Sequence, residues 1–287
     1  MTTMDGRAVA TELKQELIER VRALAKRGVK PHLAILKVNP DERTEKYVRA
    51  KSELGRAIGV RVSVYEFETS TRPQTLYDQI HKTLVDLNQD QLVHGIILQL
   101  PLSADLDTDQ LLNTIKPEKD VDGLTATNEA ALETGRELFP PATPLGILRL
   151  LAYYKVPISG KKFTIIGQGR LVGRPLAWML ASRGAQVQTG DRTTRDLTKL
   201  TQDADVIVSA AGTANLITAD MIKPNTVLID VGLAKQDATL VGDIDEAAKA
   251  KSRLATPVPG GVGPMTVVSL LSNVILAAEY QQLKLSQ

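Results

Sequence analysis

The sequence predicts an α/β protein built from two three-layer α/β domains, the second of them a Rossmann-like dinucleotide-binding domain, with an active-site cleft between them. Two observations carry this prediction. Strand-like and amphipathic helical patterns alternate along the first third of the chain, which is typical of a parallel sheet covered by helices. In the second half, an apolar run from Phe163 to Ile166 ends at a glycine-rich turn and continues as a helical pattern. The length of 287 residues also favours two domains.

Helices and strands alternate from the start of the chain. Apolar residues from Val9 to Leu24 recur at steps of three and four, which predicts one face of an amphipathic helix that ends at Gly28. The following patterns predict strands over 33–38, 60–67 and 95–100, with helices over 43–58 and 74–87 between them. This order implies a parallel sheet with helices on its faces.

The second domain follows a polar, turn-rich segment, 116–123, which we interpret as the crossing between domains. Thr143 is a good N-cap and Pro144 suits a first helical position, so they predict a helix start. Further patterns predict strands over 163–166, 185–189, 205–211, 226–231 and 240–243, and helices over 171–182 and 267–280. We expect the last helix to return to the first domain, which gives domain bounds of 1–121 with 267–287, and 122–266.

Composition excludes several classes of function. The net charge of +2 implies no field strong enough to recruit nucleic acid or a membrane, and no uninterrupted apolar run reaches the length of a membrane span. The first seven residues lack an apolar segment, so we expect no secretory signal and a cytoplasmic protein. There is no cysteine, and the three histidines show no ligand spacing, so no metal site is expected.

The glycine turn has the spacing Gly167-x-Gly169-x-x-x-Gly173, with Val172 where the third glycine of the commoner fingerprint falls. Glycines permit a tight turn and close approach of the backbone, and the free N–H groups of a helix N-terminus can hold a pyrophosphate. The alternative is an ordinary strand–turn–helix corner. Since ligands bind beyond the carboxyl ends of parallel strands, the loops 167–173, 190–195, 211–214 and 232–234 are expected to ring one site.

Three places in the first domain carry candidate chemistry. Tyr47 and Lys51 lie one turn apart on a helix face, where a ring can cover a heterocycle and an ammonium can reach its reacting atom. The alternative is a solvated helix, because several arginines and lysines are nearby. Gln99 ends a buried strand and is either a satisfied edge residue or a site residue. Asp120 and Asp122 flank Val121, and their alternative role is ordinary turn chemistry.

The segment Thr256–Thr266 contains three prolines and three glycines. These residues are expected to forbid a regular element and to dictate one backbone path that can include a cis X-Pro bond. We interpret the segment as a rigid loop that lines a ligand.

Together these motifs resemble the methylenetetrahydrofolate dehydrogenase/cyclohydrolase family. They occur in the order of that family and cover nearly the whole chain. The matching segments are Tyr47–Lys51, Gln99–Leu102, Lys119–Gly123, Thr143–Pro144, Leu171–Pro175, Ile229–Gly232, Val241–Asp243 and Pro257–Thr266.

The resemblance implies a homodimeric enzyme with two linked reactions. 5,10-Methylenetetrahydrofolate gives a hydride to a nicotinamide cofactor, and water opens the resulting 5,10-methenyl cation to 10-formyltetrahydrofolate. Lys51 is the main catalytic residue by analogy, Gln99 tunes it, Tyr47 stacks on the folate and Asp122 grips the pterin. The residues expected to bind the folate are Tyr47, Lys51, Gln99, Leu100, Pro101, Asp122, Pro259, Gly260, Gly261 and Val262.

For the cofactor, NADP is favoured over NAD. Asp191 stands where an acidic residue bonds the ribose hydroxyls of NAD, whereas Arg192, with Arg170 and Arg195 nearby, can pair with a 2′-phosphate. Arg192 also matches the position that relatives use for that phosphate. The expected cofactor residues are Gly167, Gln168, Gly169, Arg170, Val172, Gly173, Arg192 and Leu233.

The sequence departs from the family pattern at a few places. Thr44 replaces the usual serine three residues before the tyrosine but keeps a hydroxyl, and Ala142 replaces a cysteine that has no assigned role here. Gln168-Gly169 replaces the more usual arginine or small residue followed by serine. Three alternatives stay open: a dehydrogenase of this family without cyclohydrolase activity, another Rossmann oxidoreductase, and a non-catalytic nucleotide-binding module.

Overall fold

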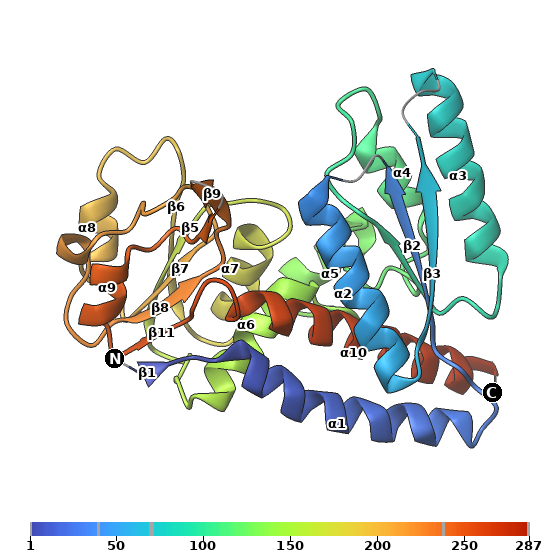
Figure 1. Ribbon diagram of the computed structural model, residues 1–287, viewed down its shortest axis with the longest axis horizontal. Helices are drawn as coiled ribbons and strands as arrows, with labels where there is room; N and C mark the ends of the chain where they lie inside the picture. The colour runs from blue at the N-terminus through green and yellow to red at the C-terminus, as the bar shows by residue number, and fades with distance from the viewer. Residues whose placement is uncertain (1, 39–40, 69–71, 237–238, 286–287) are drawn as a thin grey trace. The chain divides into compact units, whose positions relative to one another are not determined.

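The computed structural model describes residues 2–38, 41–68, 72–236 and 239–285 (Figure 1). The chain divides into two compact units. Unit 1 comprises Met1–Glu12 and Thr143–Thr266, and unit 2 comprises Leu13–Ala142 and Val267–Gln287. Both units are α/β with parallel sheets, as the sequence predicts. The units are defined by backbone contacts, and the functional domain bounds given above stay a prediction.

Unit 2 is built on a three-stranded parallel sheet, whose central strand is β2, His32–Val38. β3 (Arg61–Phe67) and β4 (Gly95–Leu98) lie on either side of it. The connecting helices are α2 (Glu42–Ile58) and α3 (Pro73–Gln89), which run alongside β2 and β3 in Figure 1. Because crossovers between parallel strands are right-handed, two neighbours on opposite sides of β2 place α2 and α3 on opposite faces.

The core of unit 2 follows from this alternation. Ala34 and Leu36 of β2 point to the same face and are fully buried against Ile80 and Leu84 of α3. Burial of each such large aliphatic side chain contributes about 1.5–3 kcal/mol. The opposite face of β2 carries Lys37, whose ammonium pairs with carboxylates of α2 and β3. The register of the strand is therefore fixed from both faces.

Two short helices of unit 2 were not predicted. They are α4 (Thr108–Thr114) and α5 (Ala126–Glu133). Each begins with a side-chain cap: Asp107 accepts from the N–H of Gln110, and Thr125 accepts from that of Asn128. Two turns are too short to show a clear apolar period, so only the caps mark them in the sequence.

Unit 1 contains a six-stranded parallel sheet with the order β1-β11-β8-β7-β5-β6. These strands are β1 (Thr2–Thr3), β5 (Lys162–Ile166), β6 (Gln186–Gly190), β7 (Val206–Ser209), β8 (Val227–Asp230) and β11 (Leu254–Ala255). The helices of this unit include α7 (Gly173–Ala181), α8 (Leu197–Thr201) and α9 (Glu246–Lys251), with a 3-10 turn η1 (Ala219–Met221). The strand predicted over 240–243 is β10 (Thr239–Val241), and it pairs with β9 (Ala234–Gln236) outside the main sheet.

The observed bounds of α1 and α6 differ from the prediction. α1 spans Gly6–Ala25, which confirms the first amphipathic helix and extends it. α6 spans Ala142–Tyr153, so the prediction that Thr143 is the N-cap was wrong by at least one residue. The Thr143 hydroxyl instead lies 3.0 Å from the hydroxyl of Thr266.

The prediction of no regular element over 256–266 was also wrong in its second half. The last helix, α10, spans Val262–Leu285 and so begins inside that segment. Pro264 lies in its first turn, where backbone N–H groups have no partner within the helix. Proline, which lacks an N–H, therefore removes no helical hydrogen bond at this position. α10 is long and apolar enough to cross a membrane by length and composition, but 72% of its apolar window is buried, which is typical of a core helix.

Candidate active site

The first group of candidate residues lies at the carboxyl end of the sheet in unit 2. The N–H of Gln99 donates to Leu36 at 2.8 Å, so Gln99 continues the pairing of β4 with β2 beyond the last regular residue. The strand order reverses at β2, since the chain passes from β2 to β3 on one side and later to β4 on the other. Such a switch point forms the crevice in which α/β sheets bind ligands.

Helix α2 brings Lys51 to this crevice. The helix begins at a side-chain cap, in which Asp41 accepts from the N–H of Thr44 at 2.7 Å, and it ends at Gly59 with φ 88°. Lys51 is only 6% exposed, and its ammonium donates to Oε1 of Gln99 at 2.8 Å. Tyr47 lies one turn earlier on the same helix and is half-buried. The solvated-helix alternative is therefore wrong for Lys51.

Asp122 joins these residues from a third segment. The N–H of Ile96 in β4 donates to the carbonyl of Lys119 at 2.8 Å, which lays the segment 119–122 beside β4. Asp122 interacts electrostatically with Lys51. Asp120, in contrast, accepts from the backbone N–H groups of Leu124 and Thr125 and is a structural turn residue. The two aspartates thus have different roles although the sequence presents them alike.

The electrostatics of this group favour proton transfer. Burial lowers the pKa of Lys51, and the nearby Asp122 carboxylate partly opposes that effect. Burial raises the pKa of Asp122, and the Lys51 ammonium opposes that rise. A lysine with a lowered pKa can release and take up protons closer to neutral pH than an exposed lysine can.

The proline–glycine segment lies in unit 1 and has one tightly fixed path. The peptide bond between Val258 and Pro259 is cis, as the sequence analysis allowed. The N–H of Gly261 donates to Pro257 at 2.9 Å, and Gly260 has φ 112°, a conformation that favours glycine. Gly260, Gly261 and Val262 are buried, and Pro259 is exposed.

Gly6 is a contact of this segment that the sequence analysis missed. A side chain at Gly6 would place its Cβ 1.7 Å from the carbonyl oxygen of Gly261, so the two backbones touch directly. The sequence signal for it was weak: a single glycine three residues before the first apolar residue of the predicted helix.

The glycine turn after β5 explains the spacing of its three glycines. Gly167 has φ 92°, and a Cβ there would lie 2.5 Å from the carbonyl oxygen of Ala210. A Cβ at Gly173 would lie 1.7 Å from the carbonyl oxygen of Gly167. Gly169 differs from both, because a Cβ there would meet nothing within 4 Å. Two glycines close the turn, and the third faces open space.

This turn also lies at a switch point, because β5 pairs with β6 on one side and with β7 on the other. The remaining candidates of the same loop, Gln168, Arg170 and Val172, lead into α7, and Leu233 follows β8 on the same sheet. The backbone N–H groups at the start of α7 and the open space at Gly169 fit a pyrophosphate.

The two residues that bear on the choice of cofactor differ in their contacts. Asp191 accepts from the N–H and the hydroxyl of Thr193, at 2.8 and 2.6 Å, and these hydrogen bonds lower the pKa of its carboxyl. Arg192 is exposed and has no partner within the part of the chain that the structure describes. The arginine is therefore available to an anion, while one oxygen of the aspartate is already engaged.

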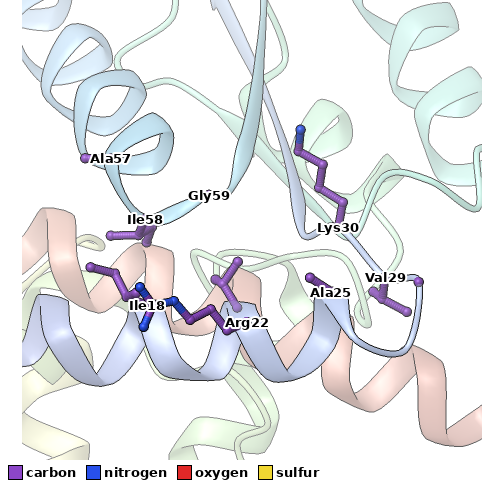
Figure 2. A pocket seen from close by; sticks show the side chains of 10 residues that line it. Ile18, Arg22, Ala25, Val29, Lys30, Ala57, Ile58 and Gly59 are labelled. Atoms are coloured by element: carbon purple, nitrogen blue, oxygen red, sulfur yellow. The ribbon is translucent and has the colours of Figure 1, made fainter.

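Among the described residues, no group of three or more His, Cys, Asp or Glu side chains could hold a metal ion. A cavity of about 480 Å³ lies in unit 2 at the ends of α1 and α2, where Figure 2 shows Ile18 and Arg22 near Ile58 and Gly59. None of the candidate site residues lines this cavity.

The fold and the two groups of residues define an α/β enzyme with a dinucleotide-binding unit and a separate group of ionisable residues around a buried lysine. Two family models match. The catalytic domain of tetrahydrofolate dehydrogenase/cyclohydrolase matches residues 4–122, and the NAD(P)-binding domain of the same family matches residues 141–282. The chain belongs to the tetrahydrofolate dehydrogenase/cyclohydrolase family.

Known relatives are similar to this chain in sequence and structure over nearly its whole length. The bifunctional protein FolD of Campylobacter curvus is 42% identical over 97% of this chain and 96% of its own length. A crystal structure of the bifunctional FolD methylenetetrahydrofolate dehydrogenase/cyclohydrolase of Campylobacter jejuni is 38% identical, with a TM-score of 0.94 over 98% of this chain and 99% of that one. The Trypanosoma brucei enzyme, solved with NADP and an inhibitor, is 32% identical, with a TM-score of 0.92 over 98% of both chains. The expected family and fold class are confirmed.

Proposed function

We propose that this chain is a bifunctional enzyme of one-carbon metabolism. It oxidises 5,10-methylenetetrahydrofolate to 5,10-methenyltetrahydrofolate with NADP and hydrolyses that product to 10-formyltetrahydrofolate. The observation that carries the proposal is the buried ammonium of Lys51, 2.8 Å from Gln99 and beside Asp122, in a chain that matches both domains of the family.

Lys51 handles the protons of the hydrolytic step. Water adds to the bridging carbon of the methenyl cation and loses a proton; the bond from that carbon to one ring nitrogen then breaks, and the nitrogen takes up a proton. A buried lysine suits both transfers because its pKa is lowered, and an adjacent substrate cation would lower it further. Gln99 fixes the ammonium through its Oε1, and its own Nε2 donates to the carbonyl of Leu100 at 3.1 Å.

The remaining candidates of unit 2 bind the folate in this proposal. Tyr47 stacks on the ring system one turn from Lys51, and Asp122 grips the pterin. Burial raises the pKa of Asp122, and its carboxyl oxygens can accept hydrogen bonds. Leu100 and Pro101 follow Gln99 and line the folate site. We keep Pro259, Gly260, Gly261 and Val262 as folate-binding residues on the family resemblance alone.

NADP supplies the hydride acceptor of the first step when it is bound. Gly167, Gly169 and Gly173, with Gln168, Arg170 and Val172 between them, would hold its pyrophosphate at the start of α7, and Leu233, after β8, would contribute to the same site. Arg192 pairs with the 2′-phosphate, which supports NADP over NAD because the arginine has no other partner among the described residues. A homodimer and a cytoplasmic location complete the proposal.

The test is turnover of the purified protein. Mixed with 5,10-methylenetetrahydrofolate, it should reduce NADP faster than NAD, which absorbance of the reduced nicotinamide reports. Supplied with 5,10-methenyltetrahydrofolate alone, it should accelerate the loss of that compound. Oxidation without hydrolysis would show a monofunctional dehydrogenase, and no turnover of either folate would refute the proposal.

A further inference from the structure

The geometry points to Asp243 as a positioning residue that builds one wall of the cofactor site. This inference deepens the proposed function and depends on it. No sequence pattern distinguishes this residue beyond the segment Val241–Asp243, to which no role was assigned. Asp243 is fully buried and lies two residues after β10.

The Asp243 carboxylate is held almost entirely by one loop. Its Oδ2 accepts from the N–H of Ala211 at 2.7 Å and of Gly212 at 3.2 Å, and its Oδ1 accepts from the N–H of Thr213 at 2.8 Å. The hydroxyl of Ser209, at the end of β7, donates to Oδ2 at 2.8 Å. Four donors from five consecutive residues therefore converge on one carboxylate, which fixes the path of the backbone after β7.

That loop borders the switch point at which the cofactor is proposed to bind. β7 pairs with β5, so the loop 210–213 and the glycine turn 167–173 leave neighbouring strands at the same edge of the sheet. The two loops touch, since a Cβ at Gly167 would lie 2.5 Å from the carbonyl oxygen of Ala210. A displaced 210–213 loop would therefore disturb the glycine turn as well.

Asp243 also supports a second predicted loop. A Cβ at Gly232 would lie 1.8 Å from Oδ1 of Asp243, so the backbone just before Leu233 rests directly on the carboxylate. Asp230, at the end of β8, holds the backbone of Asp243 in turn, accepting its N–H at 2.9 Å. One buried side chain thus underlies the loops after both β7 and β8.

This arrangement determines what the loop after β7 can offer a cofactor. The N–H groups of Ala211, Gly212 and Thr213 already donate to Asp243, so they cannot form a nest for a phosphate. The loop contributes shape and carbonyl oxygens, and binding of the pyrophosphate is left to the glycine turn and the start of α7.

The test compares cofactor binding with cyclohydrolase activity, which needs no cofactor. Asp243→Asn replaces one acceptor oxygen with an N–H₂ group that faces donors, so we expect the KM for NADP and the Kd for NADPH to rise about 5- to 50-fold. Hydrolysis of 5,10-methenyltetrahydrofolate by the same preparation should stay within about twofold of wild type. Ser209→Ala removes a single donor, and we expect a rise of about 2- to 5-fold.

Asp245→Asn is the matched control. Asp245 lies two residues away and caps α9 by accepting from the N–H of Ala248, and none of the hydrogen bonds that it makes within the described residues reaches the 210–213 loop. Asparagine caps a helix about as well as aspartate, so this variant should keep its stability and leave the KM for NADP unchanged. If Asp243→Asn binds NADPH as tightly as wild type, or if Asp245→Asn weakens NADPH binding equally, the positioning role is refuted.

If Asp243→Asn fails to fold, Ser209→Ala decides: an unchanged KM for NADP overturns the role, and a selective rise supports it. Failure of the proposed function gives a different result, because wild-type protein would then turn over neither folate.

Discussion

The two candidate sites of this protein share a position in their folds and differ in what they are made of. Each lies at the carboxyl end of a parallel sheet, at the strand where the order reverses: β2 in unit 2 and β5 in unit 1. The site of unit 2 consists of ionisable and polar side chains around Lys51. The site of unit 1 consists of backbone, exposed by glycines at which a Cβ has either no room or no neighbour.

The difference in composition suits the two sites to different tasks: side chains in the site of unit 2 can carry chemistry, and backbone in the site of unit 1 can bind a cofactor. A buried ammonium is costly, because burial disfavours the charged form. Lys37 offsets this cost by pairing with two carboxylates, whereas the lowered pKa of Lys51 suits a group that transfers protons. A glycine turn carries no titratable group and gains its affinity from N–H groups that approach a phosphate closely. Variants of the first site should therefore change rate, and variants of the second should change cofactor affinity.

The largest effect is expected for Lys51→Met. Loss of the proton-handling group should lower the cyclohydrolase kcat about 10³-fold, within the usual range for general acid–base catalysis. Folate binding should persist, as measured by equilibrium titration. Lys46→Met is the matched control on the same helix, since Lys46 is exposed and its ion pair among the described residues is the surface pair with Glu42. Equal loss of hydrolysis in both variants, or full activity of Lys51→Met, would contradict the role of Lys51.

The second prediction concerns the buried Asp230 of unit 1 and the way in which its raised pKa makes the stability of the protein depend on pH. Burial raises the pKa of Asp230 from its ordinary value of 3.8 to about 6, against the opposing effects of two backbone N–H groups and the Lys249 ammonium 3.4 Å away. The folded state therefore holds the proton more tightly than the unfolded state, and stability falls as the pH rises through this range.

One pKa unit corresponds to about 1.4 kcal/mol, so the rise in the pKa of Asp230 corresponds to about 3 kcal/mol of folding free energy. We expect the free energy of unfolding of wild type, relative to that of Asp230→Asn, to fall by about this amount between about pH 4 and pH 6.5. Denaturant titrations at several pH values measure it. A difference that does not change with pH would show that Asp230 titrates normally in the folded chain.

The third prediction concerns Arg192→Ala. Loss of a charge-assisted contact with the 2′-phosphate should raise the KM for NADP about 10- to 30-fold and leave the KM for NAD within about twofold, because NAD lacks that phosphate. Arg195→Ala is the control, since Arg195 is exposed in the same loop. An equal effect of Arg192→Ala on both cofactors would remove the basis for preferring NADP.

The smallest effect is expected for Gly169→Ala. The added methyl group meets no protein atom within 4 Å, so the melting temperature should stay within about 2 °C of wild type. It would occupy space proposed for the pyrophosphate, and the KM for NADP should rise about tenfold. Gly173→Ala gives the contrast, because its methyl would clash with the carbonyl of Gly167 and should destabilise the fold. A normal KM for Gly169→Ala would place the pyrophosphate elsewhere.

The sequence predicted those helices and strands whose apolar residues form a recognisable pattern. Most strands of the two sheets and the long amphipathic helices follow from patterns of apolar residues, and α2 was placed to within one residue of its observed start. The two-residue strands β1 and β11 of the six-stranded sheet were not predicted. Short helices such as α4 were missed, because one or two turns have no readable period. The start of α10 was missed for a different reason: Pro264 signals a break, but it is harmless in a first turn.

The candidate site was predictable only in part. The spacing of Tyr47 and Lys51 places them on one helix face, but nothing local shows that Lys51 is buried or that its partner lies 48 residues away at Gln99. Asp120 and Asp122 look equivalent until their hydrogen bonds are known. Asp243 could not be recognised at all, because its role depends on a loop about 30 residues earlier in the chain.

The pairing of the first strand has a consequence for how the protein is made. β1, at Thr2–Thr3, pairs with β11 at Leu254–Ala255, and Gly6 rests on the carbonyl of Gly261. During synthesis, the first residues leave the ribosome long before their partners exist. Unit 2 can assemble its own sheet from residues 32–98 early, whereas unit 1 must wait for nearly the whole chain to be translated. The sheet of unit 2 is therefore expected to form before that of unit 1, although unit 2 is complete only once the part of α10 after Val267 has also been made.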